Sequence, residues 1–191
     1  MRRIPFAGAV AFLGFLACVP LANWMIGHAG TVCVPNGGPC LIPVAPDFGH
    51  GTLMAPSGVL MAGFALVLRD VVQRLLGKSW SLVAILFGTV LSVLVAPPGL
   101  VVASGTAFLL SELADFAVYT PLQRRRLVLA VIASASVGLV VDSVVFLSLA
   151  FHSLDFLPGQ VIGKAWAVAI SIPLVRGLRR LAPSPATRSG A

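Results

Sequence analysis

Residues 127–151 read LVLAVIASASVGLVVDSVVFLSLAF, a run of 25 residues in which Asp142 carries the only charge. A helix that crosses the hydrocarbon core of a membrane needs about 20 predominantly apolar residues. Three arginines, Arg124, Arg125 and Arg126, come directly before the run, and basic residues of this kind are enriched in cytoplasmic loops. The stretch therefore predicts a transmembrane helix that enters the membrane from the cytoplasm.

The rest of the chain repeats this pattern. Of the 191 residues, 58% are hydrophobic and 10% are charged, whereas soluble domains carry about 25% charged residues. The apolar runs are continuous and lack the alternation that is typical of a membrane β-barrel. We therefore predict an all-α membrane protein in which one domain, residues 1–182, is a six-transmembrane-helix bundle, with spans at residues 4–26, 53–70, 79–96, 98–119, 127–151 and 158–175.

The basic residues outside the spans indicate the topology. They lie before the first span, between the second and third, between the fourth and fifth, and after the sixth, and the other three connections have none. The positive-inside rule then places both termini in the cytoplasm. Because the net charge of +7 comes from these clusters, it does not predict nucleic-acid binding. Residues 183–191, rich in Pro, Ser and Ala, are expected to form a disordered cytoplasmic tail.

The first span and the loop after it each allow a second interpretation. Residues 4–26 resemble a signal peptide after Arg2 and Arg3, but their length and the missing cleavage site favour a retained helix. The loop at residues 27–52 faces outward and contains Cys33 and Cys40. An oxidising environment and the turn residues between them favour a disulfide over two free thiols or a metal site.

Six ionisable residues lie inside the predicted spans: Arg69, Asp70, Glu112, Asp115, Asp142 and Lys164. At a rise of about 1.5 Å per residue, the first four share a layer toward the cytoplasm, with Arg69 as the counter-ion, while Asp142 and Lys164 can pair nearer the outside. Charges at membrane depth are costly and mark solute pathways by default. Two other readings stay open: Arg69, Asp70 and Asp115 snorkel to the headgroups, and the Asp142–Lys164 pair only holds helices together.

Patterns of catalysis are missing from the sequence. It contains no His-Glu-x-x-His motif, no Gly-x-Ser-x-Gly motif and no phosphate-binding Gly-rich loop with a lysine. We therefore predict no enzyme, no catalytic residue, no metal and no cofactor.

Several of these segments together resemble the VUT family of queuosine-precursor transporters over most of the chain. The segments that carry the resemblance are Asn23 at the end of the first span and residues 69–77 (RDVVQRLLG), 111–115 (SELAD), 122–125 (LQRR), 134–143 (SASVGLVVDS), 163–164 (GK) and 170–173 (ISIP). None of these motifs is specific alone, but their order and spacing match the family across five spans.

The resemblance implies a multi-pass transporter in a prokaryotic plasma membrane, the cell inner membrane, that takes up a 7-deazaguanine such as 7-cyano-7-deazaguanine for tRNA queuosine salvage. A carboxylate can accept the donor edge of such a solute, and an aromatic ring can stack on its face. The candidate binding residues are Glu112, Asp115, Asp142, Lys164, Asn23 and Arg69, with Trp24, Phe108 or Trp166 for stacking.

The predicted partners are a small solute and the lipid bilayer, and a homo-oligomer is left open. The alternative is a substrate-binding membrane subunit of the vitamin-capture type, which would act with a separate energising complex and dock through a small-residue seam such as Ala7 and Ala11. A membrane scaffold without a solute is a third reading.

Overall fold

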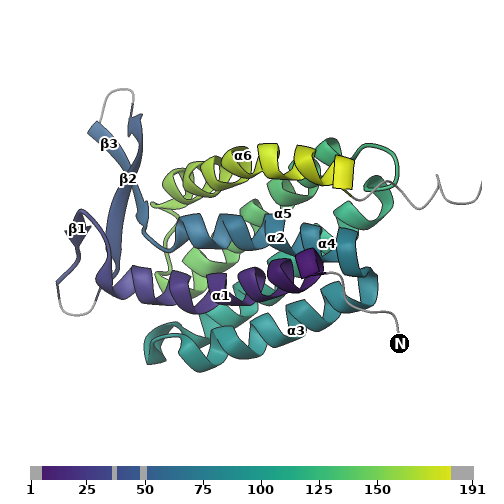
Figure 1. Ribbon diagram of the computed structural model, residues 1–191. Coiled ribbons are helices and arrows are strands. Elements are labelled where there is room, and N and C mark those ends of the chain that lie inside the picture. The colour runs from purple at the N-terminus through teal and green to yellow at the C-terminus, as the bar shows by residue number, and fades with distance from the viewer. Residues whose placement is uncertain (1–5, 36–37, 48–50, 182–191) are drawn as a thin grey trace, which may run out of the picture.

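In a computed structural model, which describes residues 6–35, 38–47 and 51–181, the chain forms six α-helices and a three-stranded sheet. The helices run side by side, and the sheet stands at one end of the bundle (Figure 1). Arg2, Arg3 and the predicted tail at residues 183–191 lie outside the described residues. The helices are α1 (Phe6–His28), α2 (Val59–Leu76), α3 (Lys78–Val95), α4 (Val101–Leu122), α5 (Leu127–Ala150) and α6 (Leu157–Leu181), and a short 3₁₀ helix, η1 (Pro98–Leu100), precedes α4.

Five segments of the described chain are long and apolar enough to cross a membrane, and they comprise α1, α3, η1 with α4, α5 and most of α6. Large apolar side chains such as Phe87 and Leu94 point outward from α3, where lipid can cover them. The remaining predicted span is the second along the chain, α2. It differs from the other five because it has only 18 residues and carries Arg69, Asp70 and Arg74. Since α2 contacts each of the other five helices, protein rather than lipid surrounds these charges.

The sheet corrects the all-α prediction. Its strands β1 (Val32–Cys33), β2 (Cys40–Asp47) and β3 (Gly51–Pro56) are antiparallel in the order β1-β2-β3. Residues 53–56, which we predicted to begin the second span, pair with β2, and α2 begins only at Val59. The apolar residues before Pro56 merge with the helical run in sequence, but a residue that precedes proline favours an extended backbone.

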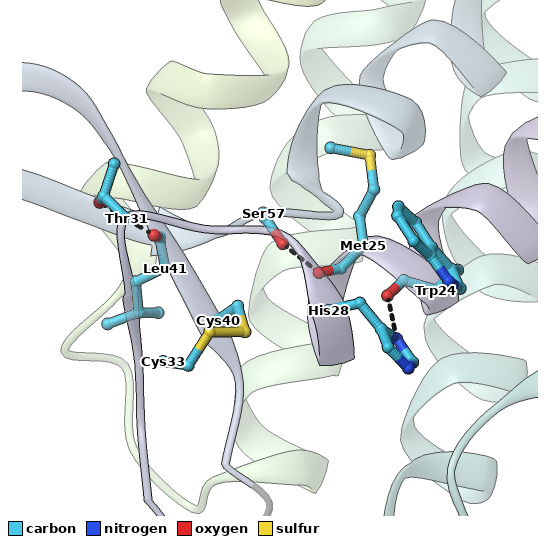
Figure 2. The surroundings of a disulfide bond; sticks show 8 residues. All are labelled: Trp24, Met25, His28, Thr31, Cys33, Cys40, Leu41 and Ser57. Carbon is cyan, nitrogen blue, oxygen red and sulfur yellow. Dashed lines mark hydrogen bonds between the residues drawn. A yellow bond between two sulfur atoms is a disulfide. The ribbon is translucent and has the colours of Figure 1, made fainter.

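A disulfide joins two strands of the sheet, and hydrogen bonds of Ser57 tie the sheet to the bundle (Figure 2). Cys33 and Cys40 are opposite each other on β1 and β2 and are joined by a disulfide. The Ser57 hydroxyl donates to the Met25 carbonyl at 2.7 Å, and the Ser57 backbone N–H donates to the Cys40 carbonyl at 2.9 Å. The end of α1, strand β2 and the start of α2 are therefore tied at one point.

Glycines allow α2 to approach its neighbours closely. A Cβ at Gly63 of α2 would lie 2.7 Å from Ala167 Cβ and 2.8 Å from the Lys164 carbonyl oxygen, both on α6. A Cβ at Gly138 of α5 would lie 2.8 Å from Leu66 Cδ2 of α2. Small residues of this kind let helices pack backbone to backbone in membranes. These contacts set the spacing of the central helix.

We expect Gly63→Ala to destabilise the protein by about 1–3 kcal/mol, because α6 must move away to admit the new methyl group. Gly177→Ala is the matched control, since a Cβ at this second helical glycine meets nothing within 4 Å and alanine favours a helix. Thermal unfolding in detergent measures both variants. Equal melting temperatures for the two variants would contradict the close α2–α6 contact.

Candidate functional site

A buried lysine on α6 is fully satisfied by polar partners. Lys164 Nζ lies 2.6 Å from Asp142 Oδ2 of α5 and donates to Ser143 Oγ at 2.7 Å and to Gln160 Oε1 at 2.6 Å. These partners use the three donors of the ammonium group. The Lys164 side chain is 1% exposed, but that of Asp142 is 19% exposed. The carboxylate is therefore the more accessible member of the pair.

Asp142 faces a cavity of about 100 Å³ on the axis of the bundle. One water needs about 10–15 Å³ by this measure, so the space admits several waters or a small solute. The cavity lies toward the sheet, near the last turns of α1 and the first turns of α2. All six helices line it, through residues that include Asn23, Val59, Ser92, Ser104, Phe108, Asp142, Phe146, Gln160 and Lys164.

A second charged cluster lies farther from the sheet, around Arg69 at the middle of α2. Its Nε lies 3.3 Å from Glu112 Oε2, and its Nη1 donates to Gln73 Oε1 at 3.1 Å. Its Nη2 lies 2.9 Å from Asp70 Oδ1 and is also paired with Asp115. The fork of the guanidinium group therefore joins α2 to α4 through charged hydrogen bonds.

The burial of this cluster overturns the interfacial reading of its members. Arg69 and Asp115 are each 0% exposed, and Asp70 is 1% exposed. Arg69 lies about 15 Å along α2 at 1.5 Å per residue, because the helix begins at Val59 rather than at residue 53. Tyr119 places its ring 5.5 Å from the Arg69 guanidinium carbon. These charges therefore cannot snorkel to headgroups.

Helix α4 connects the two clusters. Ser111 Oγ lies 3.4 Å from Asp142 Oδ1, while the next residue, Glu112, pairs with Arg69. Beyond the Arg69 cluster, a cavity of about 10 Å³ is lined by Asp70, Arg74 and Tyr119, among others. The cluster thus closes the bundle between a larger cavity on the sheet side and a space of about one water on the far side.

The structure gathers some of the predicted binding residues at the cavity and places others elsewhere. Asn23, Asp142 and Lys164 line the cavity, as does Phe108 among the stacking candidates. The described residues that line it do not include Glu112, Asp115, Arg69 or Trp166. Trp166 is 55% exposed, and its indole N–H donates to the Val44 carbonyl at 3.1 Å, so this ring supports the sheet.

Several residues that line the cavity were not predicted from the sequence as binding residues. Phe146 lies one helical turn after Asp142 and therefore on the same face of α5; this spacing could have identified it. Cys18, Ser92 and Ser104 also line the cavity. Nothing in their spacing distinguishes them from other small residues in the spans.

Five apolar helices around a polar interior define a multi-pass membrane protein. Residues 92–182 match the model of a family described as "Putative vitamin uptake transporter", which is the VUT family that the sequence resembles. The matched segment contains α4, α5 and α6, with Glu112, Asp115, Asp142 and Lys164. No curated protein and no solved structure matches the chain. The family match favours solute uptake over catalysis.

We expect Arg69→Met to destabilise the protein by about 3–5 kcal/mol, because it leaves buried carboxylates without their cation. Arg69→Lys should recover only part of this loss, since one ammonium group cannot replace the fork of the guanidinium. Arg176→Met, at an exposed position of α6, is the control and should stay near wild type. Chemical unfolding in detergent measures all three. An Arg69→Met variant as stable as Arg176→Met would refute a central role for the cluster.

Proposed function

We propose that the protein is a membrane transporter for a small purine-like solute, a queuosine precursor such as 7-cyano-7-deazaguanine, imported for tRNA queuosine salvage. The observation that carries this proposal is the cavity on the bundle axis, which all six helices line and onto which the Asp142 carboxylate opens. The family match over residues 92–182 supports uptake as the activity. A site shared by all six helices suits a solute that must pass between them.

The chemistry of the cavity wall fits a flat solute with a donor edge. Asp142 is already held by Lys164 on one oxygen, and within the described part of the chain its other oxygen has only the long contact with Ser111. It can therefore still accept hydrogen bonds from an amidine-like edge. Gln160 adds an amide, and Phe108 and Phe146 add aromatic faces for stacking. In this proposal Asp142 binds the solute, while Glu112, Asp115 and Arg69 form the closed layer behind it.

The basic residues support an orientation for this transporter. Arg74, Lys78, Arg124 and Arg176 lie at helix ends away from the sheet (Figure 1). Under the positive-inside rule this end and both termini lie in the cytoplasm. The disulfide-bonded sheet and the cavity then face the oxidising exterior, where a solute for import would enter.

Asp142→Asn should abolish uptake while the protein still inserts into the membrane. Removing a charged acceptor costs about 1.5–3 kcal/mol, which lowers solute affinity tenfold or more. The assay measures queuosine in the tRNA of cells that cannot make it, supplied with a 7-deazaguanine and carrying the variant or an empty vector. Asp155→Asn changes an exposed carboxylate and should behave as wild type. Normal uptake by Asp142→Asn would remove the proposed site, and a variant that merely unfolds is recognised by its melting curve.

Purified protein in liposomes distinguishes the transporter from the capture subunit of a larger complex. We expect a radiolabelled 7-deazaguanine to equilibrate across the membrane with this chain alone. Solute that binds but never crosses would favour the capture subunit. The predicted docking seam gives that alternative little support, because Ala7 is exposed while Ala11 is buried within the bundle.

A further inference from the structure

Carboxyl groups outnumber cations in the interior of the bundle. Around Arg69 lie three carboxyl groups, those of Asp70, Glu112 and Asp115, and each of these residues is at most 1% exposed. Arg74 lines the smaller cavity together with Asp70, so among the described residues the cluster holds at most two cations against three acids. The Asp142–Lys164 pair is neutral by itself and cannot offset the difference. At least one negative charge therefore remains if all three acids are ionised, at a helix that the other five helices enclose.

Two of the three acids lie close together. Asp70 and Asp115 share one nitrogen, Nη2 of Arg69, and the Ser134 hydroxyl donates to Asp70 Oδ2 at 3.1 Å. Asp115 Oδ2 is buried and has no hydrogen-bond donor within the described part of the chain. Two ionised carboxylates that lie close together repel, whereas one proton between them forms a hydrogen bond and removes the excess charge.

Groups that can exchange a proton lie on both sides of this pair. Water in the cavity of about 10 Å³ can reach Asp70, which lines it. On the sheet side, Glu112 lies between the pair and Asp142 at the larger cavity. Among the described residues, the titratable and charged groups around the pair and its neighbours come from α1, α2, α4 and α5, and they are Cys18, Arg69, Arg74, Glu112, Tyr119 and Asp142.

We propose that Asp70 and Asp115 hold one exchangeable proton between them and that the protein couples solute import to the movement of this proton. The proton is taken from water on the sheet side and released to water on the far side, so no other reactant is required. The coupling rests on the proposed function, but the presence of the proton does not. Opening the closed layer separates α2 from α4 and thereby parts Asp70 from Asp115, which is the step at which the proton can leave.

Infrared spectroscopy tests the proton site without any transport. Purified wild-type protein at neutral pH should show the carbonyl stretch of a buried carboxylic acid, and Asp115→Asn should lose it. Asp155→Asn, the exposed control, should keep the band. A wild-type spectrum without the band, or a band that survives in both Asp115→Asn and Asp70→Asn, would overturn the proposal.

Proteoliposomes test the coupling. An inward proton gradient of one pH unit should drive accumulation of a 7-deazaguanine up to about tenfold for one proton per solute, with the membrane potential clamped. Asp115→Asn should still equilibrate the solute but lose accumulation, and Asp155→Asn should retain it. Accumulation driven by a sodium gradient alone, or by protons in Asp115→Asn, would refute the coupling. Solute that never crosses in any gradient would end the proposed function and the coupling with it, while the infrared band would still decide the proton site.

Discussion

The structure depends on keeping one guanidinium group paired at the centre of a membrane bundle. Arg69 is completely buried and is bound by acids from two helices. An unpaired charge at this depth would cost several kcal/mol, so α2 cannot face lipid, and the five apolar helices must enclose it. The position of α2 at the centre of the bundle is thus a consequence of its charge. The glycines that let α6 and α5 approach it satisfy the same requirement.

The two charged clusters differ in their access to water, and this difference gives them different capacities. Lys164 directs all its donors to protein atoms but leaves Asp142 partly exposed at the cavity. The three acids around Arg69 are instead each at most 1% exposed. A carboxylate that is held in place and still open can receive a ligand, whereas one that is enclosed can only close a passage or carry a proton. Whether an acid can receive a ligand therefore depends more on the cation beside it than on its position along the helix.

The sequence predicted the helices and the ion pairs within the bundle more accurately than it predicted which side chains face the cavity. Continuous apolar runs located five spans, and counting residues along them placed Asp142 beside Lys164 and Glu112 beside Arg69. The start of α2 was misplaced because residues 53–55 are as apolar in a strand as in a helix. Trp166 lies outside the cavity lining, and helical periodicity could not predict this, because it cannot decide which neighbour a face meets when most faces are apolar. The cavity depends on six helices at once, and no single segment encodes it.

Any passage from the cavity to the far end of the bundle must go through the Arg69 layer. α4 packs along its length against α5, whereas it meets α2 chiefly through this cluster. Parting α2 from α4 removes two of the acids from Arg69 but leaves Asp70 on its own helix, so the cation is never without a partner. The acids that stay on α4 must then be hydrated by water, protonated, or hydrogen-bonded by the passing solute, because buried carboxylates do not remain ionised alone. The pairing of Arg69 with acids from α2 and α4 therefore links the opening of the bundle to the binding of water, a proton or the solute by these acids.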